Sequence, residues 1–369
     1  MATSTEDSEL LRSAVRDALN QLSTSEEVRR AMATARGYED KTWQRLSREL
    51  GLPGLSIAEE YGGAGLTEQE LGIAIEEAGA SLLCAPLFAT AALAVPLLKA
   101  LDDEEAIARY APRIAAGKLT ATVALAEDSG TWQPSAVAAT ARPAGDGEGW
   151  LLNGVKNYVV DGATAGLILV VARAFGAARP ASGELGVFAV DNGAPGLDVE
   201  QLVTLDQTRK QARVTLSDVR ARRVGVGATD AIAAVDKATA VSRALLAAEQ
   251  AGGAQHCLDM TVAYAKARVQ FGRAIGSFQA IKQRLAEMLI LTESAKSAAH
   301  AAIEAAASSA PDLEHVAAVA ALTAGEAYAY VSAQTVQLHG GIGFTWEHDA
   351  HLHFKRARAS AILLGTASE

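Results

Sequence analysis

The sequence contains only two cysteines, Cys84 and Cys257, in 369 residues. So few thiols cannot form a disulfide framework, and they are typical of a protein from a reducing compartment. The first residues, MATSTEDSELL, are acidic and lack the apolar core of a signal peptide. The apolar run ATAALAVPLL near residue 90 is shorter than the roughly 18–20 residues of a membrane span and contains Pro96. We therefore expect a cytoplasmic protein with no membrane partner.

Positive charge is also scarce, because 33 Lys and Arg face 43 Asp and Glu and leave a net charge of -10. Without a basic surplus to neutralise phosphates, a nucleic-acid partner is excluded, although one anionic ligand at a local basic spot is not. Aromatic residues make up only 5% of the chain, whereas alanine is abundant. Alanine loses no side-chain entropy in a helix, so the long alanine-rich runs predict helices.

The pattern of apolar and polar residues changes twice along the chain. From residue 8 to about 117, apolar residues recur at helical spacing, as in LLRSAVRDALNQL, broken by LGLPGL and YGGAGL. From about 120 to 226, short β-branched or alternating runs such as TATVAL and GLILVVAR are separated by Gly, Pro, Asp and Asn, which indicates an antiparallel sheet or barrel. Helical patterns return from residue 228: up to Arg268, from Phe278 to Ser308, from Leu313 to Leu338 and from about His351.

This order of segments predicts an α+β protein and not the βαβ alternation of a doubly wound fold. At 369 residues, several packed units are expected. We predict an N-terminal helical domain over 1–118, a central antiparallel β domain over 119–227 and a C-terminal helical bundle over 228–369.

Two stretches of the helical third are distinctive. YAKARVQFGRAIGSFQAIKQRLAEM (Tyr264 to Met288) resembles the signature of the acyl-CoA dehydrogenases, a helix, an RxQFG turn and a second helix. VQLHGGIGFTWEH (Val336 to His348) resembles the second signature of that family. LGLPGLSIAEEYGGAGLT, APGLDVEQ and ARVTLSDVRA match its N-terminal and β domains, so the resemblance covers nearly the whole chain. It implies three domains, helical, β and helical, assembled as a tetramer or pair of dimers with FAD at the subunit interface.

The resemblance also implies a reaction. In that family a carboxylate removes the α-proton of an acyl-CoA thioester while the flavin accepts the β-hydride. Hydrogen-bond donors polarise the thioester carbonyl, and an electron-transfer protein takes the electrons onward. A groove holds the acyl tail. An acyl-CoA is therefore the expected substrate.

The signatures supply candidate cofactor residues. The family's matching positions contact the pyrophosphate and adenine side of an FAD that is bound mostly by a neighbouring subunit. An arginine fork suits phosphate oxygens, and paired glycines permit close backbone approach, although a surface arginine and an ordinary helix stop would look the same in isolation. The candidates are Arg268, Gln270, Phe271, Phe278, Gln279, Gln337, Gly340 and Gly341. Arg243 matches an arginine beside the acyl groove and is the substrate-binding candidate, with a solvated helix face as the alternative.

Two other chemistries are excluded by pattern. His348, His351 and His353 lie near one another in the sequence, but they lack a HExxH or Cys/His framework, so no metal is predicted. There is also no GKT or GKS, which excludes a phosphate-binding P-loop.

The catalytic base is the feature that does not match. Most family members carry it in an IYEGT-like segment, whose counterpart here is AILLGTASE with Leu364 at the glutamate position. Leucine cannot accept a proton. Some relatives place the base at the position of Ser242, which is no base at neutral pH either. Glu249, two turns further along that helix and on the same face, is the remaining carboxylate candidate, with a surface or interface glutamate as the alternative.

The flavin-facing β domain departs from the family pattern as well. The TEPxxGSD-like loop is reduced to fragments in ALAEDSGTW (residues 124 to 132). The tryptophan and threonine that lie over the flavin are replaced by Tyr158 and Val160; tyrosine can stack, but valine cannot donate a hydrogen bond.

These departures favour one hypothesis. The chain resembles the base-lacking subunit of heteromeric α2β2 acyl-CoA dehydrogenases from bacteria that degrade steroid side chains, in which a sister chain supplies the base. Three alternatives stay open: a homomeric dehydrogenase with a relocated base, a flavin-dependent oxidase or hydroxylase on the same fold, and a non-catalytic scaffold.

Overall fold

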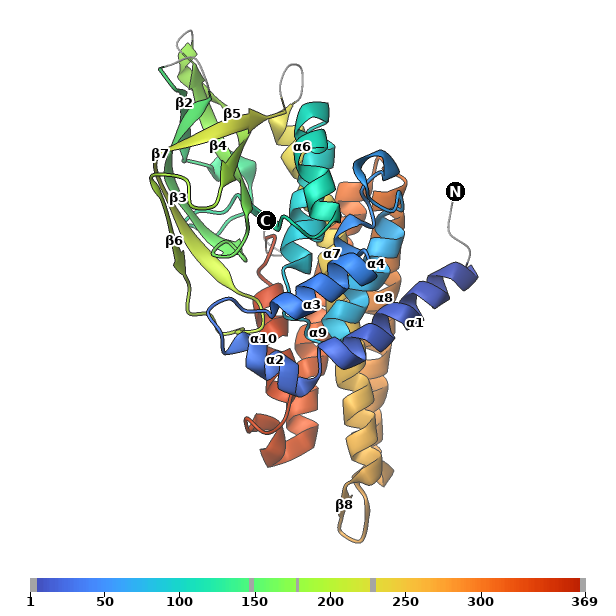
Figure 1. The fold of residues 1–369 in the computed structure, drawn as a ribbon. Coiled ribbons are helices and arrows are strands. Elements are labelled where there is room, and N and C mark those ends of the chain that lie inside the picture. Colours follow the sequence, from blue (N-terminus) through green and yellow to red (C-terminus); the bar gives the residue numbers. More distant parts are fainter. Residues whose placement is uncertain (1–4, 146–148, 177–178, 226–229, 366–369) are drawn as a thin grey trace. The chain divides into compact units, whose positions relative to one another are not determined.

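The computed structural model of the chain, shown in Figure 1, describes residues 5–145, 149–176, 179–225 and 230–365. It divides into two compact units. Unit 1 is drawn from residues 1–30, 68–84 and 243–363, and unit 2 from residues 31–67, 85–242 and 364–369. Helix α7 (Ala231–Ala267) contributes its first part to unit 2 and the rest to unit 1.

Unit 1 is helical. Besides the larger part of α7 it contains α1 (Thr5–Leu22), α2 (Ser25–Met32) up to residue 30, α4 (Glu68–Ala80), α8 (Gln279–Ala307), α9 (Leu313–His339), the 3-10 turn η7 (Gly340–Phe344) and α10 (Ala350–Ser360). The helix ranges predicted from apolar spacing in the C-terminal third agree with α7 to α10 to within a few residues. Pro311 lies in the turn between α8 and α9, because it cannot continue a helix.

Small residues let the helices of unit 1 approach closely. A Cβ added at Gly252 of α7 would collide with the backbone oxygen of Glu76 on α4, and one at Gly79 of α4 would collide with the backbone oxygen of Glu249 on α7. The core of this unit also includes Met288, Tyr328 and Val331 from α8 and α9. Alanine and glycine therefore serve packing here as well as helix propensity.

Unit 2 contains the sheet and the remaining helices. The strands are β1 (Ala121–Ala124), β2 (Thr140–Pro143), β3 (Trp150–Val160), β4 (Leu167–Gly176), β5 (Arg179–Asp191), β6 (Leu197–Gln201) and β7 (Gln211–Val224). The main helices are α3 (Asp40–Gln44), η4 (Phe88–Ala94), α5 (Val95–Ala100) and α6 (Glu104–Ala115). The sequence order of helical, β and helical segments is confirmed.

The strands of unit 2 close into a barrel. They pair in the order β1-β4-β2-β3-β7-β5, β6 pairs with β7, and β5 pairs back onto β4. Alternating side chains fill the interior, among them Leu152, Val170, Phe188 and Val214. Most pairs are antiparallel, as predicted, but β1 and β2 run parallel to β4. Strand alternation alone cannot distinguish the two directions, because both have a period of two.

One segment, Leu313–Phe344, is long and apolar enough to cross a membrane by length and composition. Within its most apolar window, 44% of the residues are buried inside the chain. A core helix meets the same test. The exposed apolar side chains of α9, Val319 and Leu322, lie within this segment.

Candidate functional site

Leu364 occupies the position where the resemblance places the base. It lies just after α10 with a left-handed backbone, φ 66°, and its side chain is 1% exposed. Gly365 follows with φ 104°, and Thr366 lies outside the described residues. A leucine in this conformation is strained by roughly 1–3 kcal/mol, so the surrounding packing fixes it. The chain therefore keeps an unusual backbone at this point without the carboxylate.

Leu364 and Ser242 line the same small cavity. Its volume is about 20 Å³, and its other walls are Leu93, Leu97, Val123, Leu125, Trp132, Val235, Ala238 and Thr239. The Ser242 hydroxyl donates to the backbone oxygens of Ala92 at 2.6 Å and Ala238 at 2.8 Å, so its proton is engaged in the helix packing. Trp132, from the altered flavin loop, is 6% exposed. The two positions at which the family places its base thus meet at an apolar cavity, and no carboxylate is among the described residues that line it.

Glu249 is held elsewhere, in a buried ion pair within unit 1. Arg356 of α10 donates from Nη1 to Glu249 Oε1 at 2.6 Å, and the two side chains are 3% and 7% exposed. A carboxylate in this position has its charge matched by a guanidinium. The glutamate is neither on the surface nor at an exposed interface of this chain.

The RxQFG motif forms a protruding turn. After α7 ends, Arg268 N–H donates to Tyr264 O at 2.8 Å, and β8 (Val269–Gln270) pairs with β9 (Arg273–Ala274). Phe271 and Gly272 connect them with φ values of 52° and 77°, the conformation of a two-residue type I′ turn. Phe271 is 92% exposed and Arg268 is also exposed, whereas the Gln270 side chain donates to the backbone oxygen of Val269. Figure 1 shows this hairpin extending past the ends of neighbouring helices of unit 1.

Phe278 and Gln279 stand at the root of the hairpin. The ring of Phe278 contacts that of Phe271 edge-on, with centroids 6.2 Å apart, and the Arg273 guanidinium lies 4.1 Å from the Phe278 centroid. Gln279 is exposed at the first turn of α8. Two aromatic rings and two arginines therefore gather at one tip.

The second signature ends α9. Gln337 is exposed in the last turn, and Gly340 has φ 64° and ψ −142°, which only glycine adopts readily. A Cβ added at Gly340 or Gly341 would meet no atom within 4 Å, so the backbone there is open to a ligand. Tyr264 of α7 donates to His339 O at 3.3 Å, which brings the ends of α7 and α9 together.

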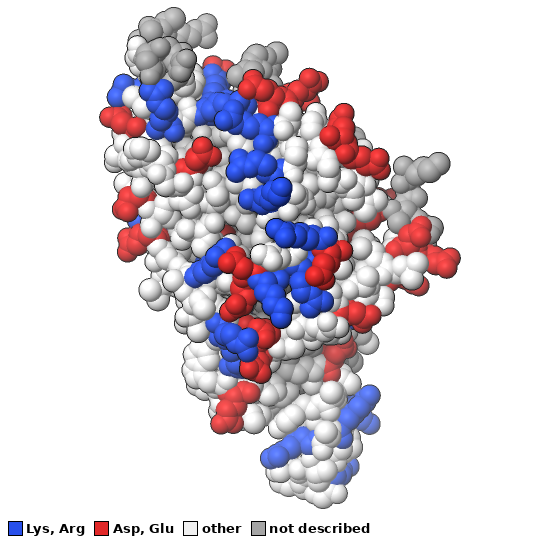
Figure 2. All heavy atoms as spheres, viewed as in Figure 1, with Lys and Arg blue, Asp and Glu red and all other residues white. Residues whose placement is uncertain are grey.

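These residues fit the phosphate and adenine end of FAD. Arg268, Arg273 and Lys266 are exposed basic side chains, and in the view of Figure 2 the tip that carries β8 shows basic and no acidic side chains. Exposed Phe271 offers a face for stacking, and the glycine pair permits close approach. Arg243, the predicted substrate residue, is half-buried on α7.

On the flavin-loop side, a buried lysine organises the backbone. Lys156 of β3 is fully buried and donates to Glu127 Oε1 at 2.8 Å and to Leu125 O at 3.0 Å. Glu127 also accepts from the N–H groups of Ala138 and Ala139. Burial lowers the pKa of Lys156 to about 8. For Glu127, burial raises the pKa, but the hydrogen bonds from Lys156 and Ala139 outweigh it and lower the pKa overall.

The two residues that replace the family's flavin-facing pair lie further along β3. Tyr158 has φ 58° and is 40% exposed, so its ring is available for stacking. Val160 is buried at 1% exposure.

Glu127→Gln is expected to cost about 2 kcal/mol of unfolding free energy at pH 7, because it leaves a buried ammonium without its counter-charge. The loss should shrink as pH rises from 7 to about 9.5, because above its folded-state pKa of about 8 the Lys156 of the parent is itself neutral and no longer needs the carboxylate. The lowered pKa means that the folded chain binds fewer protons than the unfolded chain, and removal of the carboxylate lowers that pKa further, so the variant is the less stable protein only while Lys156 of the parent is charged. Urea unfolding at both pH values measures this. A deficit that is equal at the two would contradict it.

Histidine rings make several aromatic contacts in unit 1. Rings of His339 and His348 lie 4.4 Å apart, and His353 is stacked on His256 at 4.8 Å. Nε2 of His339 and of His351 is buried without a hydrogen-bond partner in the described structure. Among the described residues, no group of three or more His, Cys, Asp or Glu side chains has the geometry to hold a metal ion.

Sequence reasoning misses several of these contacts. Lys156 and Arg356 bond to carboxylates 29 and 107 positions away, and Trp132 lines a cavity built from several elements. A single sequence does not show which distant residue each of these side chains pairs with. A lysine within an alternating strand run is the one available hint, since charged residues at inward positions need a partner.

Comparison with family models accounts for most of the chain. The model of the C-terminal domain of acyl-CoA dehydrogenases matches residues 232–368, that of the N-terminal domain residues 5–118, and that of the middle domain residues 122–219. Among curated proteins, acyl-CoA dehydrogenase IpdE2 of Mycobacterium tuberculosis is 34% identical over 100% of this chain and 96% of its own length.

Solved structures give the same result. A variant of the Tcur3481-Tcur3483 steroid ACAD is 32% identical, with a TM-score of 0.84, over 98% of this chain and 95% of its own. The ChsE4-ChsE5 complex from Mycobacterium tuberculosis is 28% identical, with a TM-score of 0.86, over 100% and 96%. An acyl-CoA dehydrogenase complexed with FAD from Bacillus anthracis shares the fold, with 21% identity and a TM-score of 0.88, over 99% and 65%.

Proposed function

Because the chain belongs to the acyl-CoA dehydrogenase family, whose cofactor is FAD, we propose that it is the base-lacking subunit of a heteromeric acyl-CoA dehydrogenase. In this proposal it completes the FAD site of a sister chain, which carries the catalytic carboxylate. The reaction is α,β-dehydrogenation of an acyl-CoA thioester, with bound FAD accepting the hydride. The domain boundaries at 118/119 and 227/228 are part of the proposal, and the second lies outside the described residues.

The observation that carries the proposal is the cavity shared by Leu364 and Ser242. An acyl-CoA needs a proton acceptor within hydrogen-bond reach of its α-carbon. Neither side chain accepts a proton, and about 20 Å³ is room for roughly one water molecule, not for a thioester. A chain with this cavity depends on another chain for the chemical step.

Relocation of the base to Glu249 is disfavoured by its ion pair. A general base must present a free carboxylate to substrate, whereas Glu249 is 7% exposed and bonded to Arg356 at 2.6 Å. Releasing it would break a buried ion pair. An oxidase or hydroxylase on this fold needs no base at the Leu364 position, and neither does a scaffold without flavin. The experiment below distinguishes these two alternatives from the proposed function.

The part played by this chain's own residues is binding. In this proposal Arg268 holds phosphate oxygens, Phe271 stacks on a ring, and the backbone at Gly340 and Gly341 lies against the cofactor. Conversely, Val160 offers no hydrogen-bond donor where the family has threonine. Residues for one end of FAD are kept while those at the reacting end are lost.

Exposed apolar side chains on two neighbouring helices support assembly with a second chain of the same family. Leu289 and Ile290 on α8 and Val319 and Leu322 on α9 are 45–66% exposed, on two helices that pack against each other. Water contact of this much apolar surface is costly, and another helical pair would cover it. One of the similar structures is named as a complex, ChsE4-ChsE5, and another carries the double name Tcur3481-Tcur3483.

The wider context follows from the relatives. A steroid ACAD is among the similar structures, so a bulky steroid-type acyl-CoA is the proposed substrate class within lipid metabolism. An electron-transfer protein is the proposed acceptor, and the cytoplasm the proposed compartment.

The test is to purify the chain alone and after co-expression with its genomic neighbour, and to measure flavin absorbance per protomer with oligomer mass. We expect a yellow mixed tetramer with fewer flavins than subunits, which bleaches with a steroid acyl-CoA. Alone, the chain should be colourless or unstable. A yellow homotetramer with one flavin per chain that is bleached by an acyl-CoA would overturn the proposal. Oxygen consumption without an added acceptor would indicate an oxidase, and a colourless complex a scaffold.

Arg268→Gln in this chain is expected to lower the flavin affinity of the mixed tetramer about tenfold to a hundredfold, because one charge-assisted phosphate contact is lost. Lys118→Gln, an exposed cation outside the proposed site, is the control and should change affinity much less. Flavin release during gel filtration and fluorescence titration with FAD report the difference. Equal affinities would remove Arg268 from the site.

A further inference from the structure

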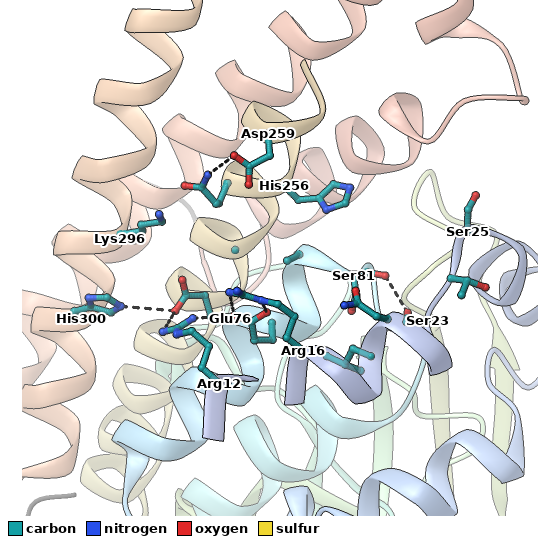
Figure 3. Close-up of a pocket in the computed structure, with 17 residues that line it drawn as sticks. Arg12, Arg16, Ser23, Ser25, Glu76, Ser81, His256, Asp259, Lys296 and His300 are labelled. Atoms are coloured by element: carbon teal, nitrogen blue, oxygen red, sulfur yellow. Dashed lines mark hydrogen bonds and ion pairs between the residues drawn. The ribbon is translucent and has the colours of Figure 1, made fainter. Parts of the chain in front are cut away.

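Unit 1 contains a groove of about 680 Å³ lined by residues of α1, α4, α7 and α8. Its lining along α1 and the start of α2 runs from Arg12 to Ser25, and Figure 3 shows basic side chains entering it from α1 and from α8. Arg12 and Arg16 stand one helical turn apart on α1, and Lys296 and His300 stand one turn apart on α8. None of the residues that line this groove is a candidate for the FAD site or lines the Leu364 cavity.

The floor of this groove is a network of ion pairs. Arg12 donates from Nη2 to Glu76 at 2.8 Å and from Nη1 to Glu77 at 2.9 Å. Arg16 donates from Nε and Nη2 to the two carboxylate oxygens of Glu77. His300 Nε2 lies 3.7 Å from Glu76. Burial lowers the pKa of Arg12, but its contacts with the two glutamates outweigh burial and raise the pKa overall. The hydrogen bonds to Glu77 likewise raise the pKa of Arg16. The arginines are thereby held in fixed positions.

The groove presents the cationic part of this network to solvent. The carboxylates are covered, with Glu76 10% and Glu77 7% exposed, whereas Arg16 is 57% and His300 60% exposed. The lining includes three permanent cations, Arg12, Arg16 and Lys296, to which His300 adds a fourth when protonated, and three carboxylates, Glu76, Glu77 and Asp259. Lys296 also bonds to Glu293 at 3.1 Å, on an exposed part of α8. Asp259 lies on the other wall, where Gln255 donates to it at 2.8 Å.

Hydrogen-bond donors remain after these pairs are counted. An arginine has five N–H groups and an ammonium has three. Arg16 bonds to Glu77 through Nε and Nη2, which leaves the N–H groups of Nη1 for a ligand, and Lys296 has two N–H groups beyond its bond to Glu293. Asn20 and Thr24 add neutral donors from the same wall. An anionic group seated between α1 and α8 would meet donors from both helices.

We infer that this groove binds the oxyanion of a small molecule, a phosphate or carboxylate group, between Arg16, Lys296 and His300. Charge-assisted hydrogen bonds from a rigidly held guanidinium are the strong contacts of such a site. The carboxylate floor orients the arginines and does not compete for the ligand, because its oxygens are covered. This inference does not depend on the subunit's role in dehydrogenation.

The experiment uses the full-length chain in its purified complex and two probes, inorganic phosphate and acetate, at ionic strength kept constant with sodium chloride. Binding is followed by calorimetry and by the imidazole NMR signal of His300, identified as the signal missing in His300→Gln. We expect saturable binding of at least one probe. Binding of phosphate assigns a phosphate ligand, and binding of acetate alone assigns a carboxylate.

Substitutions in and outside the groove test whether the anion binds between α1 and α8. Lys296→Gln and His300→Gln, which leave the Arg–Glu floor intact, should each weaken binding severalfold, and together at least tenfold. Arg16→Gln is an additional variant, to be read only where its unfolding transition matches that of the parent. Lys282→Gln, an exposed cation on α8 outside the groove, is the control and should bind like the parent. No saturation with either probe, or equal weakening in Lys282→Gln, would overturn the inference.

Discussion

Arg356→Met is expected to lower the free energy of unfolding by about 3–5 kcal/mol, because it breaks a buried ion pair by removing one partner while the carboxylate stays buried. It removes the counter-charge of Glu249, whose side chain is 7% exposed and bonded to Arg356 Nη1 at 2.6 Å. A carboxylate at that depth that has lost this guanidinium must either stay charged in a poorly solvated site or bind a proton. Urea unfolding of the purified chain or complex at pH 7 measures the loss.

Two further variants separate structure from catalysis. Glu249→Leu combined with Arg356→Met should recover much of the loss, because replacing both partners removes the buried ion pair as a whole. Arg358→Met, an exposed arginine two residues further on, should change stability by less than about 0.5 kcal/mol. If Glu249→Gln instead abolished dehydrogenation while leaving the unfolding transition unchanged, Glu249 would be a base and the ion pair incidental.

The helices of the bundle can be predicted from sequence because each carries a local signal. Alanine-rich runs, Pro311 and the glycines after Leu338 mark where α7 to α10 begin and end. For the barrel, the sequence predicts strands but not their pairings. Parallel contact of β1 and β2 with β4 joins residues 33 to 46 positions apart, and alternation does not encode that direction.

The residues of the candidate site also fall into two groups, those that a local motif identifies and those that only tertiary packing brings together. Arg268, Phe271 and Gly340 lie in contiguous motifs whose turn geometry follows from a few adjacent residues, and the structure gives them that geometry. Leu364 is identified by its place in a motif. By contrast, the cavity it shares with Ser242 and Trp132 draws on segments separated by more than 100 residues. Tertiary packing, not local pattern, decides whether a carboxylate such as Glu249 is free or paired.

A second large effect is expected on the stability of the folded chain at acidic pH. His353 of α10 is 2% exposed, its ring stacks on His256 at 4.8 Å, and its Nδ1 is bonded to Tyr328 Oη at 2.8 Å. Burial, with His256 and Arg356 nearby, lowers the pKa of His353 well below 6.5. Burial likewise lowers the pKa of His351 to about 4, with Lys355 and Arg29 adding to the effect. Both imidazoles are therefore neutral in the folded chain where the unfolded chain binds protons.

These lowered histidine pKa values determine how the stability of the folded chain changes with pH. Between the lowered folded-state pKa and 6.5, the unfolded chain binds more protons, so stability rises with pH and is lost on acidification below 6.5. His353→Gln, which can keep a bond to Tyr328, should reduce that slope by up to about 1.4 kcal/mol per pH unit, the value for one proton. Unfolding in urea at pH 7, 6 and 5 gives the slope, with the exposed His315→Gln of α9 as control. Parallel slopes for His353→Gln and the parent would show that another group unfolds the chain in acid, whereas a flattened slope would assign the acid sensitivity to the buried imidazole.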